Sequence, residues 1–111
     1  MKLDALRTAI AEAREQVLLY QPAAKADLLG AWLQVADDRG ADAADAYVEK
    51  IRDLCELIAS QPEMGVARDD VANDVRSFPV DRYVIYYEDA GSSLRVLRFW
   101  HSSQDPIRLR L

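Results

Sequence analysis

The chain has 111 residues and a mass of 12.5 kDa, the size of one small domain. Fourteen basic and nineteen acidic side chains give a net charge of -5, so we expect no direct sequence-specific binding of nucleic acid. The single cysteine, Cys55, excludes an internal disulfide and a thiolate zinc site. No stretch reaches the roughly 18 apolar residues of a membrane span, and the first residues lack the apolar core of a signal peptide. We therefore expect a soluble cytoplasmic protein with no membrane partner.

The two parts of the chain differ in charge. Residues 1–63 carry seven basic and twelve acidic side chains, whereas residues 64–111 carry seven of each. Every cation of the second part is an arginine, whose planar fork binds carboxylate or phosphate through two hydrogen bonds. The second part therefore either offers a local basic surface or pairs its arginines with nearby aspartates.

The first sixteen residues place apolar side chains in alternating steps of three and four, which predicts an amphipathic helix from Lys2 to about Gln16. A helix of this length is marginal alone, so it must pack on its own domain or on another chain. We assign residues 1–16 to an N-terminal helical extension and residues 17–111 to the domain proper.

The next segments predict a short strand and two helices. Residues 17–20 are β-prone and end before Pro22, which cannot donate to a strand ladder. Residues 23–38 have one apolar face, and a second apolar stripe runs through residues 44–58. Gly40 suits the positive φ at the end of the first helix. The short connection predicts an antiparallel αα-hairpin.

After the second helix, the spacing of apolar side chains changes from the period of a helix to the alternation of a strand. We interpret residues 63–74 as a charged loop and residues 75–80, 82–88 and 94–101 as strands, the last two joined as a hairpin. The pattern predicts an α+β fold in which the αα-hairpin packs on one face of a small, mainly antiparallel β-sheet.

Alternation along the two long strands assigns their side chains to opposite faces of the sheet. On the first of them, one face carries Tyr83, Ile85 and Tyr87, and the other carries Val84, Tyr86 and Glu88. On the last strand, one face carries Val96, Arg98 and Trp100, and the other carries Arg95, Leu97, Phe99 and His101. One face has to cover the helices, and the other could offer tyrosine and arginine to a ligand.

The residues that carry chemistry are few. His101 is the only histidine, which excludes a two-histidine metal site, and it is either a lone base or a structural side chain bonded to the following loop. Neither Ser102 nor Ser103 lies on a glycine-flanked nucleophile elbow, and Cys55 lies on an apolar helix stripe. Four glycines form no phosphate-binding loop. We expect no metal and no cofactor.

From Tyr20 onward, an ordered set of short motifs covers about four fifths of the chain. They are Pro22-Ala23-Ala24, Ala26-Asp27-Leu28 with Trp32, Pro62-Glu63-Met64-Gly65 before Arg68-Asp69, Val75-Arg76-Ser77-Phe78-Pro79-Val80, Arg82-Tyr83-Val84-Ile85-Tyr86-Tyr87, and Val96-Leu97-Arg98 with His101 and Asp105. In this order they resemble the ParE-type toxins of the RelE/ParE superfamily.

The resemblance implies the toxin component of a type II toxin–antitoxin module. Such a toxin is neutralised by a ParD-like antitoxin in a hetero-oligomer, and its ParE branch inhibits DNA gyrase by protein binding, with no catalytic residue. The candidates for contact with antitoxin or target are Arg68, Arg76, Arg82, Tyr83, Arg95, Arg98 and His101.

Two alternatives remain open. The RelE branch cleaves mRNA in the ribosome, for which His101 would be the base while Arg76 and Arg98 stabilise the phosphoryl charge. The acidic total and the polar segment Ser102-Ser103-Gln104, where many relatives carry basic residues, argue against RNA cleavage. We therefore expect a gyrase inhibitor rather than a nuclease. The other alternative is a non-toxic relative that still binds its antitoxin.

Overall fold

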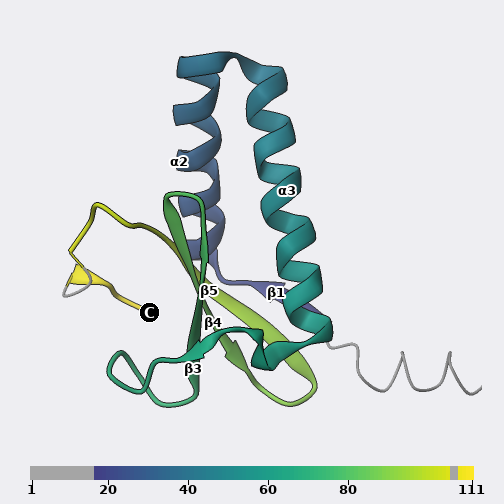
Figure 1. The fold of residues 1–111 in the computed structure, drawn as a ribbon, viewed down its shortest axis with the longest axis vertical. Helices are drawn as coiled ribbons and strands as arrows, with labels where there is room; N and C mark the ends of the chain where they lie inside the picture. The colour runs from purple at the N-terminus through teal and green to yellow at the C-terminus, as the bar shows by residue number, and fades with distance from the viewer. Residues whose placement is uncertain (1–16, 106–107) are drawn as a thin grey trace, which may run out of the picture.

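The computed structural model describes residues 17–105 and 108–111 as two long helices standing on a five-stranded sheet (Figure 1). The elements in chain order are β1 (Val17–Tyr20), α2 (Pro22–Arg39), α3 (Ala41–Ser60), the 3₁₀ turn η1 (Pro62–Met64), β2 (Val66–Ala67), β3 (Val75–Val80), β4 (Tyr83–Asp89) and β5 (Ser93–His101). The N-terminal extension predicted for residues 1–16 lies outside the described residues.

The sheet has the strand order β1-β5-β4-β3-β2. The β2–β3, β3–β4 and β4–β5 pairs are antiparallel, whereas β1 runs parallel to β5. A parallel pair needs a long crossover connection, and here the helical hairpin and three strands supply it. The predicted α+β fold with a mainly antiparallel sheet is confirmed.

The two helices form the predicted antiparallel hairpin. Gly40 joins them at a φ of 95°, and its N–H donates to Ala36 O at 2.9 Å, which closes the last turn of α2. A side chain at this φ would be strained, which explains the glycine. Pro22 occupies the first turn of α2, where its missing N–H costs nothing.

The main core lies between the hairpin and one face of the sheet. It comprises Ala24 and Leu28 from α2, Ile51, Cys55, Ile58 and Ala59 from α3, and Val80, Ile85, Tyr87, Leu94, Val96 and Phe99 from the sheet. Tyr87 also ties the end of α3 to the sheet, because its hydroxyl donates to Pro62 O at 2.6 Å and accepts from Gly65 N–H at 2.8 Å. A Cβ on Gly65 would overlap this hydroxyl, which requires glycine there.

The predicted loop at residues 63–74 is wrong at one point. Val66 and Ala67 form β2, which pairs with Ser77 and Arg76 at the edge of the sheet. Both β2 side chains are exposed, so the strand carries no alternation that the sequence could reveal.

A β-bulge in β5 overturns part of the predicted alternation. Tyr86 pairs with Arg98 but Tyr87 pairs with Val96, so Leu97 is an extra residue on β5. Val96 therefore joins the helix-facing core, and Leu97 joins the opposite face of the sheet. The predicted assignment of β4 side chains to the two faces of the sheet is correct. For β5 it is correct only after the bulge, in residues 98–101. Arg95, paired with Glu88, also lies on the face opposite to the prediction.

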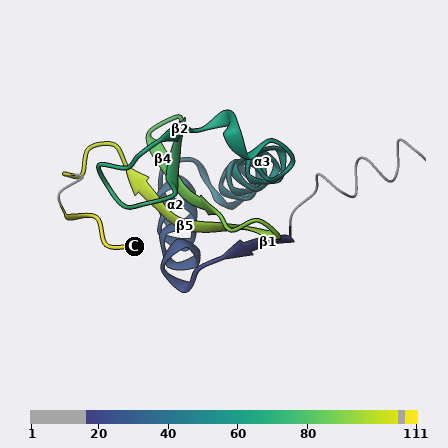
Figure 2. The ribbon, with the colours of Figure 1, turned by 90° about the horizontal axis from the view of Figure 1, so that it is seen from below.

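Much of the second face of the sheet is covered by other parts of the chain. Val75, Tyr86, Leu97, Trp100 and Leu109 form a second buried cluster, against which Val71 and Ala72 pack. Tyr86 and Trp100 are only 2% and 8% exposed. The C-terminal residues lie across the sheet from α3 (Figure 2). The sequence left open whether this face offers aromatic side chains to a ligand, and a loop and the tail cover Tyr86 and Trp100.

Candidate interaction surfaces

Arg98 fastens α2 to the sheet. Its Nε and Nη2 donate to the two oxygens of Asp27 at 2.6 and 2.9 Å, and both side chains are 17% exposed. Asp27 Oδ2 also accepts the Phe99 backbone N–H at 3.0 Å, on the stretch of β5 beyond the end of β1. The hydrogen bond to Asp27 raises the pKa of Arg98. Arg98 is therefore occupied within the fold.

Three further candidate arginines also have partners. Arg76 donates to Gly65 O at 2.8 Å. Arg68 makes two 3.0 Å hydrogen bonds to Asp70 and holds the pKa of that carboxyl below its usual range. Arg95 pairs with Glu88 across β4 and β5 at 3.1 Å. The alternative that nearby aspartates engage these arginines holds for Arg68, whereas the partner of Arg95 is a glutamate.

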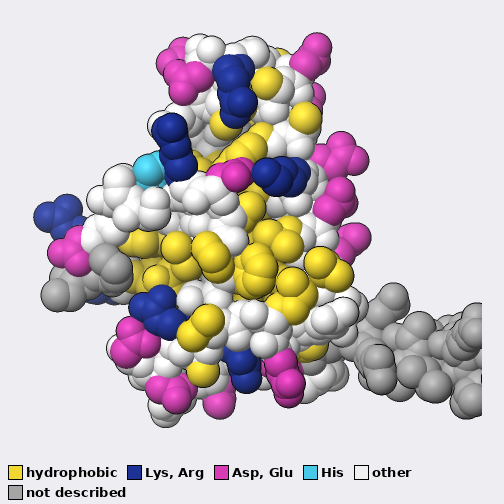
Figure 3. Space-filling view, viewed as in Figure 1, with side chains coloured by type: hydrophobic (Ala, Val, Ile, Leu, Met, Phe, Trp, Pro, Cys, Tyr) yellow, Lys and Arg dark blue, Asp and Glu magenta, His cyan; other side chains and the backbone are white. Residues whose placement is uncertain are grey.

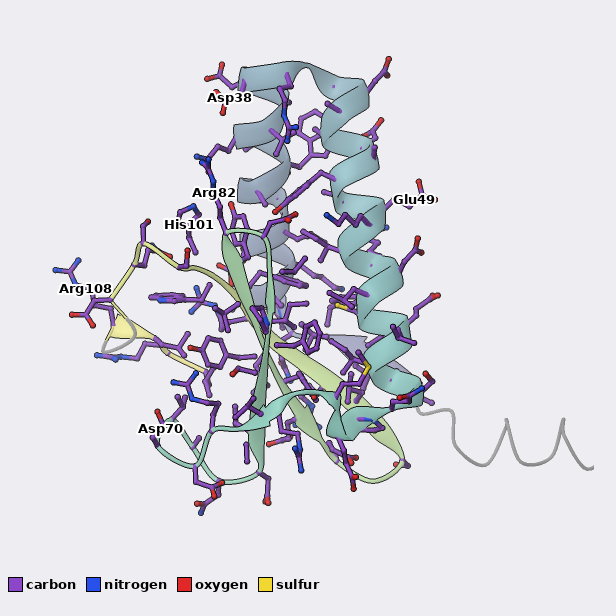
Figure 4. The ribbon with its side chains drawn as sticks, viewed as in Figure 1. Asp38, Glu49, Asp70, Arg82, His101 and Arg108 are labelled. Carbon is purple, nitrogen blue, oxygen red and sulfur yellow. The ribbon has the colours of Figure 1, made fainter. Side chains whose placement is uncertain are left out.

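The remaining candidates, Arg82, Tyr83 and His101, line one cleft of about 570 Å³, which we call the cationic cleft. Its other lining residues are Gln34, Val35, Asp38 and Arg39 from α2, Tyr47 and Lys50 from α3, and Asp81 from the β3–β4 turn. Lys and Arg side chains stand on three sides of this opening, and the cyan His101 lies against one of them (Figure 3). Figure 4 shows Arg82 and His101 side by side below the end of the hairpin that carries Asp38.

The wall of the cationic cleft combines an ion pair with a row of neighbouring aromatic rings. Asp81 adopts a φ of 52° in the β3–β4 turn, and its carboxylate accepts a hydrogen bond from Lys50 Nζ at 3.1 Å. The Tyr83 ring lies 6.5 Å from Tyr47 and meets His101 edge-on at 5.1 Å. Burial raises the pKa of both tyrosines, so their hydroxyls stay protonated at neutral pH.

His101 is bonded to the turn that follows β5. The Ser103 backbone N–H donates to His101 Nδ1 at 3.1 Å, and Ser103 Oγ lies 2.6 Å from the same nitrogen. Because Nδ1 accepts a backbone hydrogen, the proton of the neutral ring is on Nε2. In this arrangement Nε2 is a hydrogen-bond donor. This is the structural role that the sequence left open for His101.

The two arginines considered for a nuclease are engaged within the fold, and neither lines the cationic cleft. Arg76 is engaged at Gly65 and Arg98 at Asp27, whereas His101 faces the cationic cleft. The sequence did not predict that Arg39, Tyr47 and Lys50 line this cleft. Their place in it depends on how the helical hairpin packs against the strands, which is a long-range contact.

A second opening of about 320 Å³ has the opposite character, and we call it the apolar groove. It is lined by Tyr20, Lys25, Leu28, Leu29, Trp32, Val48 and Arg52. Leu29 and Leu33 lie one turn apart on α2 and are 58% and 55% exposed. Trp32 Nε1 donates to Asp45 Oδ1 at 2.8 Å, which joins α2 to α3 beside the groove. The sequence interpretation of α2 as a helix with one apolar face missed these two leucines.

Two classes of site are not found among residues 17–105 and 108–111. No group of three or more His, Cys, Asp or Glu side chains in this part of the chain is placed to hold a metal ion. No helix described here is long and apolar enough to cross a membrane.

Comparison with known proteins identifies the family. A model of the "ParE toxin of type II toxin-antitoxin system, parDE" matches residues 18–106. The Toxin ParE1 proteins of two Mycobacterium tuberculosis strains, CDC 1551 / Oshkosh and ATCC 25618 / H37Rv, are 27% identical to this chain over 88 residues, 78% of this chain and 90% of each relative. A chain from the chromosomal ParDE TA system of P. aeruginosa shares the fold, with a TM-score of 0.68 at 18% identity over 79% of this chain and 97% of that chain. The chain belongs to the ParE toxin family of type II toxin–antitoxin systems.

Proposed function

We propose that this toxin inhibits DNA gyrase and is neutralised by a ParD-like antitoxin that docks in the apolar groove. The observation that carries the antitoxin assignment is the exposed apolar surface of α2. Leu29 lines the groove with Leu28 and Trp32, and the exposed Leu33 lies one helical turn further along α2. Large exposed side chains grouped in this way mark protein-interaction sites.

The groove suits an amphipathic antitoxin segment. An apolar stripe of the partner would cover Leu29 and Trp32, and each fully buried large apolar side chain contributes about 1.5–3 kcal/mol. Lys25 and Arg52 stand at the same opening as exposed cations. They would pair with acidic side chains flanking that stripe, which favours an acidic amphipathic segment over a basic one.

The gyrase assignment rests on the family resemblance and on which candidate residues are free to bind. Arg82, Tyr83 and His101 line an open cleft and are our candidates for contact with the target, whereas the arginines needed for phosphoryl transfer are engaged elsewhere. This supports action by protein contact rather than by RNA cleavage. We expect the toxin to work in the cytoplasm, where gyrase acts.

The test is DNA supercoiling by purified gyrase, titrated with the full-length toxin alone and with its antitoxin. We expect inhibition with accumulation of cleaved DNA, and relief on addition of the antitoxin. Unimpaired supercoiling by a folded toxin that binds its antitoxin would remove gyrase as the target. An mRNA-cleavage assay on translating ribosomes would then test the RelE-type alternative.

The groove assignment has its own test. Titration calorimetry with the antitoxin reports affinity whether or not gyrase is the target. We expect the complex to elute as a hetero-oligomer, and a failure of the antitoxin to bind would contradict this half of the proposal alone.

A further inference from the structure

We propose that the cationic cleft binds a tetrahedral oxyanion of the phosphate type, held by Arg39, Arg82 and the Nε2–H of His101. This site does not rest on the identity of the target or of the antitoxin. It follows from the charges, hydrogen bonds and shape of the cleft.

The first observation is which charges in the cleft are already paired. Lys50 and Asp81 neutralise each other through their 3.1 Å ion pair. The guanidinium groups of Arg39 and Arg82 are exposed and make no hydrogen bond or ion pair with another side chain in the described part of the chain. Asp38 is the one carboxylate of the lining left to oppose them. The unpaired charges of the cleft therefore sum to one positive charge.

The second observation is that both arginines line the same cleft as Tyr47. Burial raises the pKa of the Tyr47 hydroxyl, and positive charge on Arg39 and on Arg82 opposes that rise. That hydroxyl is protonated at neutral pH and can serve as a further donor.

The third observation is the hydrogen-bond state of His101. With Nδ1 occupied by the Ser103 N–H, the remaining ring nitrogen carries the proton and has no partner among the described residues. A nitrogen that can only donate requires an acceptor atom on the ligand. Phosphate and phosphate-ester oxygens meet this requirement, and arginine is well suited to pair with them.

The origin of the donors in separate elements favours a tetrahedral ligand over a planar one. Arg39 comes from the end of α2, Arg82 from the β3–β4 turn and His101 from the end of β5, so the donors come from three separate elements. A tetrahedral phosphate presents oxygens in several directions, whereas a carboxylate presents two in one plane. The cleft volume of about 570 Å³ also leaves room for the organic part of a phosphate ester.

The single histidine makes the test direct. In the 111-residue chain, the imidazole signals of His101 can be followed by NMR without ambiguity while inorganic phosphate is added at constant ionic strength. We expect saturable shifts, and we expect the unliganded ring to carry its proton on Nε2. Shifts that rise linearly without saturation, or a ring protonated on Nδ1 alone, would overturn the proposal.

Matched variants distinguish a specific phosphate site from nonspecific attraction of anions to a positive charge. Arg82→Gln and Arg39→Gln should each weaken phosphate binding at least about tenfold, the loss expected for one charge-assisted hydrogen bond. Arg52→Gln removes the same charge from an exposed arginine in the apolar groove and should leave the phosphate affinity unchanged. Equal weakening by all three variants would overturn the site, because only net charge would then matter.

Further probes identify the source of the phosphate. Acetate should give no saturable shift, and acetate binding as tight as that of phosphate would contradict a tetrahedral site. Tighter binding of a small phosphate monoester that Arg82→Gln weakens would assign the site to a soluble metabolite. Tighter binding of a short single-stranded oligonucleotide, again lost in Arg82→Gln, would assign it to a nucleic-acid backbone.

Discussion

The apolar groove and the cationic cleft are built from the same two helices and have opposite chemistry. The groove takes Leu29 and Trp32 from α2 and is completed by Tyr20 of β1, whereas the cleft is completed by Tyr83 and His101 of β4 and β5. One opening exposes leucine and tryptophan, and the other exposes arginine and a histidine donor. The difference matches the two kinds of ligand that we propose, an amphipathic segment and an oxyanion.

The contrast arises from the lengths of the elements. Helices α2 and α3 have 18 and 20 residues, and only part of each packs on the sheet. The sheet-facing part holds the core and leaves the apolar groove beside β1. Tyr47 of α3 contacts Tyr83 at the start of β4, and the cationic cleft lies at this contact. A substitution in one opening should therefore weaken the binding of its ligand alone, whereas a substitution in the shared fold should lower the stability of the whole domain.

The largest effect should come from a residue that positions both openings. Asp27→Asn removes the charge that Arg98 and the Phe99 N–H share, and leaves Arg98 largely buried without a counter-charge. We expect a loss of about 2–4 kcal/mol in the free energy of unfolding, measured by urea denaturation. Asp70→Asn, at an exposed ion pair, is the matched control and should have a much smaller effect. Equal stability of the two variants would contradict a central role for Asp27.

A substitution in the groove should leave the fold intact and weaken antitoxin binding. Leu29→Asp places a charge in the apolar groove and should lower antitoxin affinity about hundredfold, or 2–3 kcal/mol. Leu57→Asp makes the same change at an exposed leucine of α3 outside the groove and should leave the affinity within about threefold. Titration calorimetry measures both variants. An equal loss of affinity in the two would place the antitoxin elsewhere.

Tyr87→Phe should lower stability while sparing both openings. The variant loses the hydrogen bonds of the hydroxyl with Pro62 O and Gly65 N–H, which costs about 1–2 kcal/mol. Thermal unfolding measures the loss, and binding of phosphate and antitoxin should be unchanged. Stability equal to that of the wild type would show that water satisfies these groups.

The smallest effect should be a loss of folding stability at alkaline pH, caused by the buried Cys55 thiol. Burial raises the pKa of the Cys55 thiol from 9.0 to about 11, so the folded chain keeps a proton that the unfolded chain loses. This contribution to stability is complete below about pH 9 and is lost as the pH rises towards 11. Burial shifts the pKa of Tyr20 in the same direction.

Urea denaturation at several pH values tests this dependence. Cys55→Ala should have a shallower decline in stability between pH 9 and 11 than the wild type. The wild-type thiol should also resist alkylation at pH 8 until the chain unfolds. Rapid alkylation of the folded protein, or an identical decline in the variant, would contradict the buried thiol.

Local patterns in the sequence were sufficient to predict most of the fold. The apolar stripes of α2 and α3, Gly40 between them and the alternation of β4 each report on a neighbour a few residues away. The bulge at Leu97 could not be predicted, because it depends on the pairing of two strands. The covered face could not be predicted either, since Leu109 of the tail returns to it from outside any regular element.

The candidate site was predicted only in part. Arg82, Tyr83 and His101 were named because they stand near strand ends rich in arginine and aromatic residues. Arg98 carries the same signal, and only its long-range pairing with Asp27 distinguishes it. Arg39 and Lys50 come from the hairpin, where a charged residue ordinarily indicates a solvated helix face.

The most direct test of two distinct openings is a crossed titration of two variants with two ligands. Leu29→Asp and Arg82→Gln are each titrated with the antitoxin and with inorganic phosphate. We expect Leu29→Asp to lose antitoxin affinity and keep phosphate affinity, and Arg82→Gln to show the reverse. Loss of both ligands in either variant, with the fold intact by circular dichroism, would contradict the separation of the groove from the cleft.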